Sequence, residues 1–440
     1  MNSKPLNILI LSWELFPMFA GGLGFLAKYI VTELEKQGHK VTVAVPSIPS
    51  NLKLPKNIIN LSKVVKQYQE KDLQISGLDF KLEYFRAKTE KVHKSWPDLF
   101  SNYRGKEKKP NLYPNNTPII TKAFAFAVSD LIKNNQFDIV IGMDWETIPT
   151  FVHLKSTSSI PFVFYINATE FDRNTDKFNG AARVIANLEK LSYRQADGVV
   201  SISDISKKML MKFCEIEENQ IEVIYNDLDF TPIELDIPDL QKGKNVLFIG
   251  RMETQKGISF LLETASKVIQ ADPQVKFIIA GDGAKMASTV MAVAEKELEK
   301  NILFTGWLNG NEKKLVYSSC DLFVMPSPSE PFGLTALEAI RSKLPVIASN
   351  TSGFIGIIPS TPTFDYYDTQ AFAQQILFYL NNKDAAKDLL AKQTEELSKH
   401  SWADQIKKLV VFLEKVIKNK QNLQLEASNK KEIKLKQETI

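Results

Sequence analysis

Cysteine and histidine are scarce in this chain. Its 440 residues include two cysteines and four histidines. Cys214 and Cys320 lie far apart in the sequence, and we expect both to be small buried hydrophobic side chains rather than a disulfide. A metal site built from cysteines alone is excluded because it needs more thiols. The histidines have no partner at a spacing suited to metal binding, so we expect each to be structural. They are His39, His93, His153 and His400.

Long apolar runs and a large net charge are missing as well. No segment has the roughly 18 consecutive apolar residues of a membrane span, and the apolar stretch at residues 6–12 is too short for a secretion signal. We therefore expect a cytoplasmic protein, while peripheral contact with a membrane stays open. The 55 basic and 51 acidic residues give a net charge of +4, which is too small to indicate nucleic acid as a partner.

The length and composition that remain are those of a two-domain globular protein, with 44% hydrophobic and 24% charged residues. The first half predicts parallel strands linked by helices. A first strand at residues 7–12 leads into a glycine-rich turn at residues 19–24 and then a helix that ends at Gly38. Later strands are expected at residues 41–45, 138–142, 162–166 and 198–201.

A second alternation of strands and helices begins near residue 245. Its strands are expected at residues 245–250, 275–280, 322–325 and 346–348. Pro232 and Pro238 interrupt the periodicity between the two alternations. We therefore expect a first domain at residues 1–230, which carries an irregular insertion at about 51–117, and a second at residues 231–400. A helix at residues 401–418 and a flexible charged tail at residues 419–440 should follow.

Two carboxylates lie eight residues apart in the string Ser-Glu-Pro-Phe-Gly-Leu-Thr-Ala-Leu-Glu. Because Pro331 disfavours helical geometry in the residue before it, Glu330 should be extended. Gly333 permits close approach to a ligand, and the helix that begins there presents amide groups that suit a diphosphate. Glu338 lies in that helix, roughly 7 Å along the axis from Gly333, where it could accept the hydroxyl groups of a ribose. In isolation, such a glutamate pair is more often a solvated helix face.

Two cations follow the first strand of the second alternation. Arg251 and Lys256 occur in the string Gly-Arg-Met-Glu-Thr-Gln-Lys-Gly, at the strand end where an open parallel sheet presents its ligand crevice. The two cations could neutralise a diphosphate. The alternative is that they are ordinary surface charges at a strand end with no ligand. Asp227 and Asp229 form an Asp-x-Asp string of the kind that metal-dependent transferases use. This string lies in the predicted linker, so we expect no metal there.

Together these motifs resemble family 4 of the retaining glycosyltransferases with the GT-B fold, which includes bacterial glycogen and starch synthases. The segment around Glu330 is similar to the E-x7-E motif of that family, and the segment at residues 246–257 to its phosphate-binding segment. Trp-Glu at residues 13–14 and Gly-Gly-Leu at residues 21–23 lean toward the glycogen-synthase-like branch. The resemblance reaches about residue 418. It implies an α/β fold of two Rossmann-like, doubly wound domains that face across a cleft, with a C-terminal helix crossing back to the first domain.

The resemblance also implies roles for individual residues. Glu330 would contact the transferred sugar as a catalytic residue, and Glu338 would hold the ribose. The set that would contact the sugar donor, mostly at its phosphates, is Gly21, Gly22, Arg251, Lys256, Phe332, Gly333 and Leu334, together with Glu338.

Two histidines of the family are absent here. Met143 stands where the histidine of a His-Asp-Trp segment is usual, and Asn167 stands where a histidine near the reaction centre is usual. Asn167 is kept as a catalytic candidate because its amide can hydrogen-bond a hydroxyl group, although it cannot titrate. Asp144, Glu170 and Arg173 are candidates on the acceptor side. Strand-end caps and ion pairs are the structural alternative for these three.

The expected function is retaining, metal-independent transfer of a hexose, with glucose favoured, from a UDP- or ADP-linked sugar to a glycan or another hydroxyl acceptor. No further cofactor is expected. Two alternatives stay open: a catalytically degenerate protein that binds nucleotide sugars or glycans, and a transferase that acts on a lipid or cell-envelope acceptor. A phosphorylase or epimerase is less favoured. A phosphorylase would need a lysine in a recognisable pyridoxal-binding setting, which is not found, and the two glutamates in their Pro-Phe-Gly frame fit transfer better. The sequence does not specify the base, the sugar, the linkage or the oligomeric state.

Overall fold

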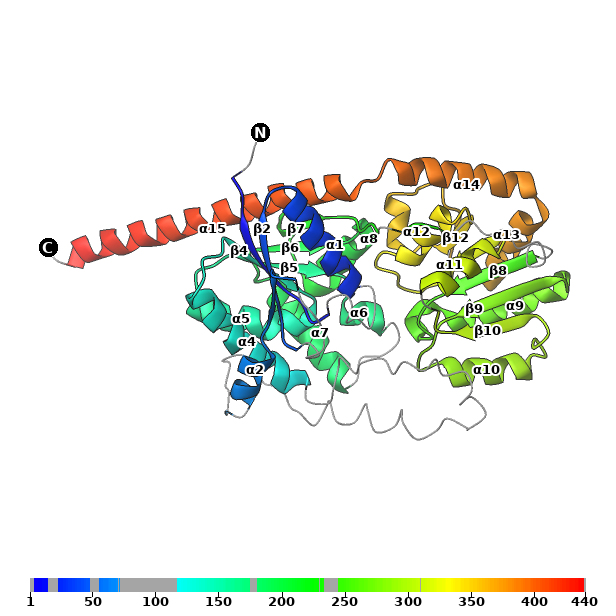
Figure 1. Cartoon of the computed structure of the whole chain (residues 1–440), viewed down its shortest axis with the longest axis horizontal. Coiled ribbons are helices and arrows are strands. Elements are labelled where there is room, and N and C mark those ends of the chain that lie inside the picture. The colour runs from blue at the N-terminus through cyan, green and yellow to red at the C-terminus, as the bar shows by residue number, and fades with distance from the viewer. Residues whose placement is uncertain are drawn as a thin grey trace.

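The computed structural model describes residues 4–14, 23–47, 55–69, 71, 117–174, 180–228, 230–232, 244–308 and 310–438. Figure 1 shows two α/β domains side by side, each built on one parallel sheet that is covered by helices. The predicted fold class, two doubly wound domains, is confirmed. The sheets explain how distant parts of the sequence come together at one site.

Within the described residues, seven strands form the first sheet in the order β3-β2-β1-β4-β5-β6-β7, and each neighbouring pair is parallel. All five residues of β5 are buried, because helices cover both faces of the sheet and apolar side chains suit both. The strands are β1 (Asn7–Leu11), β2 (Lys40–Val45), β3 (Ile58–Asn60), β4 (Ile139–Met143), β5 (Phe162–Ile166), β6 (Gly198–Ser201) and β7 (Ile221–Val223).

In the described part of the second domain, six strands form the sheet in the order β10-β9-β8-β11-β12-β13, again with parallel neighbours. Its central strands are buried in the same way, including all four residues of β11. The strands are β8 (Lys244–Ile249), β9 (Val275–Ala280), β10 (Ile302–Gly306), β11 (Leu322–Met325), β12 (Val346–Ser349) and β13 (Thr363–Phe364).

Helices supply the crossovers that parallel strands require. Those of the first domain are α1 (Leu23–Lys36), α2 (Ser62–Gln69), α4 (Thr117–Lys133), α5 (Ile148–Thr157), α6 (Glu170–Arg173), α7 (Gly180–Tyr193) and α8 (Asp204–Cys214), with short 3₁₀ turns η2 (Trp145–Thr147) and η3 (Glu218–Gln220). Those of the second are α9 (Ile258–Ala271), α10 (Met286–Glu295), α11 (Gly310–Ser318), α12 (Leu334–Arg341), α13 (Thr369–Asn381) and α14 (Lys383–Ser398), with η4 (Thr254–Lys256) and η5 (Gly353–Gly356).

The strand order reverses once in each sheet, between β1 and β4 in the first and between β8 and β11 in the second. At such a point the loops that follow the two central strands diverge, and ligands of open parallel sheets bind in the resulting crevice at the carboxyl ends. The loops after β8 and β11 carry Lys256 and Glu330, and the loop after β4 carries Asp144. The topology therefore places these predicted site residues at the two points of strand-order reversal, one in each sheet.

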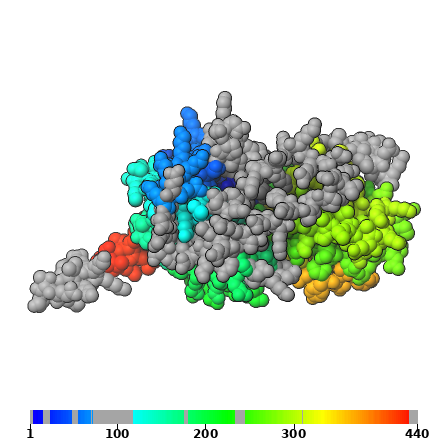
Figure 2. Space-filling view, turned by 90° about the horizontal axis from the view of Figure 1, so that it is seen from below, coloured from blue at the N-terminus to red at the C-terminus, as the bar shows by residue number. Residues whose placement is uncertain are grey.

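The last helix, α15 (Trp402–Glu438), crosses from the second domain back along the first, as expected. Gln37 Nε2 donates to the carbonyl of Ala403 at 2.9 Å, and Lys420 lies 2.7 Å from Asp197. The predicted end of this helix near residue 418 was wrong. Residues 402–438 contain no glycine or proline and are rich in good helix formers, so the helix continues to Glu438. Figures 1 and 2 show its red part projecting beyond the first domain.

The predicted strands agree with the structure to within one residue at each end, and β5, β6, β9 and β11 agree fully. Among the strands of the described residues, β3, β7, β10 and β13 were not predicted. The irregular insertion predicted at residues 51–117 needs correction, because β3 and α2 lie inside it, while residues 72–116 lie outside the described residues. Cys214 and Cys320 are free thiols, the first buried and the second partly buried, as expected.

Candidate active site

An ion pair marks the point where the carboxyl ends of β8 and β11 meet. Lys256, in η4, places its Nζ atom 2.6 Å from Oε2 of Glu330, in the loop after β11. The side chains are only 18% and 10% exposed, so the pair is held in a partly desolvated setting. Ser327 Oγ lies 3.4 Å from the same carboxylate oxygen. The structure thus brings together two residues that the sequence analysis had assigned to the same ligand.

Backbone pairing holds Glu330 in an extended conformation, as Pro331 predicted. Its amide donates to the carbonyl of Thr351 at 3.3 Å, and its carbonyl accepts from the amide of Gly353 at 2.9 Å. Glu330 and Ser352 form a parallel bridge. The loop after β11 is therefore tied to the loop after β12.

Gly333 caps the N-terminus of α12 and needs to be glycine for two reasons. Its φ of 111° lies in the region that L residues rarely adopt, and a Cβ there would come within 3.0 Å of the Phe354 ring and 3.1 Å of the Met325 sulfur. Leu334 begins the helix directly after it. Phe332 is buried, and its carbonyl accepts from the Phe354 amide at 2.7 Å, so its side chain packs in the core. The donor-binding role of Phe332, Gly333 and Leu334 stays a prediction.

Glu338 sits farther along α12 and faces α11. The hydroxyl of Tyr317 donates to its Oε2 at 2.7 Å, and Lys313 forms an ion pair with the same oxygen. Burial and the neighbouring Glu338 raise the pKa of Tyr317 well above its usual range, so the phenol stays a donor. The carboxylate predicted to hold a ribose is thus already fixed in orientation.

Arg251 lies in the same loop as Lys256, exposed to solvent. Its Nη2 donates to Gln255 Oε1 at 3.2 Å. The loop is packed tightly against the loop after β9, because a Cβ on Gly281 would lie 1.8 Å from the Gly250 carbonyl oxygen. Its backbone is therefore fixed, and the two cations stand on one rigid loop.

On the first domain, Asp144 and Asn167 meet at the carboxyl ends of β4 and β5. The backbone amide of Asn167 donates to Asp144 Oδ1 at 2.7 Å, and the Asn167 side-chain amide lies 3.5 Å from that oxygen. Asp144 has a positive φ of 57°, unusual for a residue other than glycine. Burial raises its pKa to about 6, against the opposing effects of Arg173 and two backbone amides. Met143, the residue before it, is fully buried in the core.

Glu170 and Arg173, on α6, belong to a buried network of charges. Arg173 Nη1 lies 3.5 Å from Glu170 Oε2, and its Nη2 donates to the Ala168 carbonyl at 3.1 Å. The amide of Glu170 donates to Glu189 Oε2 at 2.8 Å. Four carboxylates raise the pKa of Arg173 in spite of its burial. These contacts are the ion pairs of the structural alternative, and the acceptor-side role of Asp144, Glu170 and Arg173 stays a prediction.

Glu146 was not selected from the sequence. It is buried, and its Oε2 atom has no hydrogen-bond partner within the part of the chain that the structure describes. Burial and the charge of Asp144 raise its pKa to about 8. The sequence signal that could have identified it is its position directly after Asp144 and Trp145, shortly beyond the predicted strand at residues 138–142.

Several predictions concern residues without a described position. Gly21 and Gly22 lie outside the described residues, as do His93 and Asp229. Asp227 pairs with Arg341 Nη2 at 2.6 Å. Within the described ranges, no group of three or more His, Cys, Asp or Glu side chains is arranged to hold a metal ion. No helix in those ranges is long and apolar enough to cross a membrane.

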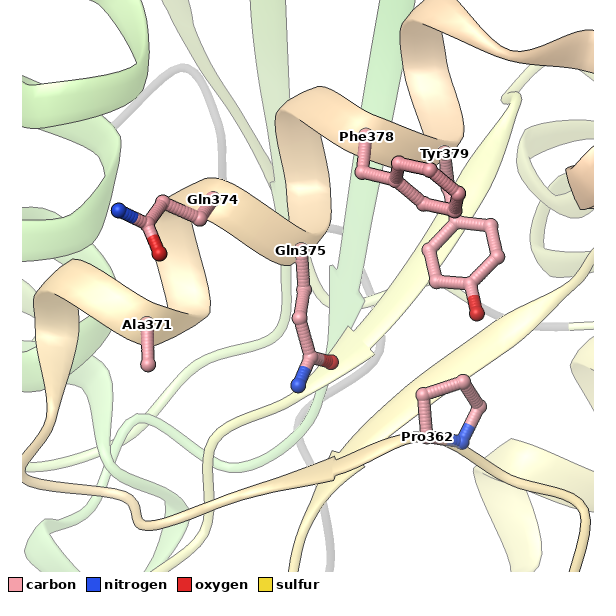
Figure 3. A pocket seen from close by; sticks show the side chains of 6 residues that line it. All are labelled: Pro362, Ala371, Gln374, Gln375, Phe378 and Tyr379. Atoms are coloured by element: carbon pink, nitrogen blue, oxygen red, sulfur yellow. The ribbon is translucent and has the colours of Figure 1, made fainter.

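A surface groove lies elsewhere on the second domain (Figure 3). It runs between α13 and the segment leading into β13, and its lining residues are Pro362, Ala371, Gln374, Gln375, Phe378 and Tyr379. None of the predicted site residues contributes to it. The groove is therefore separate from the Lys256–Glu330 site.

Known families match most of the chain. Residues 20–230 match Glycosyltransferase Family 4, and residues 234–396 match Glycosyl transferases group 1. A glycogen synthase of Mycobacterium tuberculosis is 24% identical over 355 residues, which cover 79% of this chain and 79% of that protein.

Solved structures share the fold. Sucrose-phosphate synthase from Thermosynechococcus elongatus superposes with a TM-score of 0.69 at 17% identity, covering 94% of this chain and 100% of that one. Anabaena HepE, solved in complex with UDP and glucose, superposes with a TM-score of 0.62 at 14% identity, covering 93% of this chain and 99% of that one. At these identities the likeness establishes the arrangement of both domains.

Proposed function

The chain belongs to the GT-B glycosyltransferases of the group 1 and family 4 type, and from this we propose that it moves a hexose from a nucleotide diphosphate sugar to a hydroxyl acceptor. We propose further that the transfer retains the anomeric configuration and needs no metal ion. The observation that carries the proposal is the Lys256–Glu330 pair, which lies next to the N-terminus of α12 at the strand-order reversal of the second sheet.

Arg251, Lys256 and the first amides of α12 would bind the diphosphate. Two cations and the positive end of a helix dipole offset the charge of the phosphates, which in other transferases is the task of a metal ion. Lys256 would then contact both the phosphate and Glu330. That placement would leave the other oxygen of Glu330 to accept a hydroxyl of the sugar, while Glu338 would accept the ribose hydroxyls.

In the proposed reaction the acceptor oxygen attacks C1 of the sugar from the face that the diphosphate leaves. The bond between C1 and the acceptor oxygen forms, and the bond between C1 and the phosphate oxygen breaks with its electron pair going to the phosphate. The acceptor proton passes to that phosphate oxygen. The cations Arg251 and Lys256 stabilise the charge that develops on the leaving group, so the chain needs no general base of its own.

Glucose is the favoured sugar and a glucan the favoured acceptor. The similarity to a glycogen synthase supports the glucan, and the UDP and glucose bound to Anabaena HepE support a UDP-linked glucose. The resemblance to glycogen synthases keeps an ADP-linked donor open. A lipid or another cell-envelope acceptor is the main alternative to a glucan. We place the enzyme in the cytoplasm, where nucleotide sugars are made.

A second candidate is a protein that binds nucleotide sugars without transferring them. Asn167, in place of a titratable histidine, favours this alternative. Met143, in place of the other family histidine, favours neither candidate, because its side chain is buried in the core and could not touch a ligand.

The test is release of nucleotide diphosphate from UDP-, ADP- and GDP-sugars, with malto-oligosaccharide, glycerolipid and no acceptor as parallel arms. Glu330→Ala and Glu330→Gln serve as matched variants. Release that requires one acceptor and vanishes in both variants supports the transferase. Saturable binding of a donor by calorimetry, without release in any arm, would favour the binding protein.

A further inference from the structure

The segment that carries Glu330 touches the first domain on both sides of that residue. Ser329 Oγ donates to Oδ1 of Asp172 at 2.8 Å, and Ser203 Oγ donates to the carbonyl oxygen of Pro331 at 2.6 Å. Both contacts cross from one domain to the other, between residues 157 and 128 positions apart. Residues directly before and after Glu330 are therefore fixed by the first domain.

The partners on the first domain are buried and already oriented. Oδ2 of Asp172 accepts from the amide and the hydroxyl of Thr169, at 2.7 and 2.8 Å, in the capping box of α6. This leaves Oδ1 free to accept from Ser329. Ser203 is the N-cap of α8, where its oxygen accepts from the Ser206 amide at 3.0 Å. The same hydroxyl can still donate its hydrogen to Pro331.

Gly353 makes the close approach of the domains possible. A Cβ at this position would lie 2.0 Å from the Pro331 carbonyl oxygen and 2.6 Å from Ser203 Oγ. The Gly353 amide also donates to the Glu330 carbonyl. Three loops, after β11, β12 and β6, thus converge on the backbone of Glu330 with no room for a further side chain.

We propose that Ser203 and Asp172 are positioning residues that set Glu330 for transfer only when the first domain lies against the second. The sugar donor binds mainly to the second domain, through Arg251 and Lys256, while the acceptor approaches from the first. Hydrogen bonds between the first domain and residues 329 and 331 therefore couple the position of the acceptor domain to the geometry of Glu330, the residue that contacts the sugar. This inference rests on the proposed transferase activity.

Two variants remove one contact each and leave the rest of the site in place. Ser329→Ala deletes the hydroxyl that donates to Asp172. Ser203→Gly deletes the hydroxyl that donates to Pro331, and glycine is itself a tolerated N-cap residue, so α8 should still form. Ser288→Ala is the matched control, because its hydroxyl donates to a backbone carbonyl within the second domain at 3.0 Å.

The first measurement is steady-state transfer with the donor identified by the panel above. We expect each variant to lower kcat about tenfold, as loss of a hydrogen bond to the reacting segment would do, with KM for the sugar donor changed by less than about twofold. The Ser288→Ala control should match the wild type. If Ser329→Ala and Ser203→Gly also have the kcat of the wild type, the positioning role is wrong. If Ser203→Gly does not fold, Ser329→Ala decides alone.

The second measurement needs no turnover. Amide hydrogen exchange of residues 327–333 in the protein without ligand should be faster in both variants than in the wild type and the control. Unchanged exchange would show that the contacts do not hold the segment, and it would overturn the inference. A wild type that transfers no sugar from any donor would instead overturn the proposed function, and with it the catalytic part of this role.

Discussion

Lys256 and Glu330 lie 74 positions apart in the sequence and 2.6 Å apart in the structure, measured from Nζ to Oε2. The proximity follows from topology, since β8 and β11 are neighbours at the reversal of strand order and each residue stands in the loop after its strand. A cation and a carboxylate that share a ligand crevice can bind opposite parts of one molecule. A sugar bound to a diphosphate has both parts.

Lys256 should therefore matter for binding of the sugar donor as well as for the chemical step. We expect Lys256→Gln to weaken binding of the sugar donor at least about tenfold, because a charge-assisted contact to phosphate is lost and Glu330 loses its ion-pair partner. Lys256→Arg keeps the charge and should lose less. Calorimetric titration with nucleotide diphosphate measures the effect. Equal affinity of wild type and Lys256→Gln would place the diphosphate elsewhere.

The conformation of Gly333 gives a prediction about stability. Gly333→Ala should lower the free energy of unfolding by more than the roughly 1–2 kcal/mol that a positive φ costs an alanine, because the new methyl group also meets Phe354 and Met325. Gly38→Ala is the matched control, since Gly38 also has a positive φ, of 90°, but open space around its Cβ position. Urea unfolding of both variants measures the difference. Equal losses would mean that the crowding at Gly333 relaxes without cost.

The sequence predicted the strands well and the surroundings of the site less well, for physical reasons. A buried parallel strand such as β5 is a continuous apolar run, which is a local pattern. The extended backbone of Glu330 was predictable because Pro331 acts on its direct neighbour. The partners of Asp172 and Ser203 in the other domain were not, since tertiary contacts between distant residues leave no periodicity. The C-terminal end of α15 was predicted too early because a polar segment without glycine is compatible with either a helix or a flexible tail.

Burial of Glu146 predicts how stability varies with pH. Its pKa is raised from 4.5 to about 8 in the folded protein, so between these values the folded state binds more protons than the unfolded chain. The free energy of unfolding should therefore fall as the pH rises from about 4.5 toward about 8. Asp144, with a pKa of about 6, acts in the same direction. Arg173 and Glu14 are the other charges that act on Glu146.

Glu146→Gln tests this account, because glutamine has nearly the same size and cannot titrate. We expect the variant to equal the wild type near pH 4.5 and to be more stable by about 3–4 kcal/mol near pH 8, since each unit of pKa shift corresponds to about 1.4 kcal/mol. Glu299→Gln, at an exposed position, should leave the pH dependence unchanged. Denaturant unfolding of the three proteins at several pH values measures how the free energy of unfolding depends on pH. Parallel curves for wild type and Glu146→Gln would show that Glu146 is not the titrating group.

Asn167 offers the sharpest choice between a transferase and a binding protein. Its backbone amide is fixed on Asp144, while its side-chain amide makes only a long contact of 3.5 Å to that carboxylate, so the side chain can be exchanged without breaking the loop. If the amide serves transfer by hydrogen-bonding a sugar hydroxyl, Asn167→Ala should lower kcat by about tenfold. Asn167→His should then keep most of the activity, because an imidazole can donate the same hydrogen bond.

If the chain lost transfer along with the histidine, the wild type and Asn167→Ala would both release no nucleotide, and Asn167→His would gain turnover. Nucleotide release measured with all three proteins at equal donor occupancy separates these outcomes, and a wild type equal to Asn167→Ala at high turnover would remove Asn167 from the catalytic site.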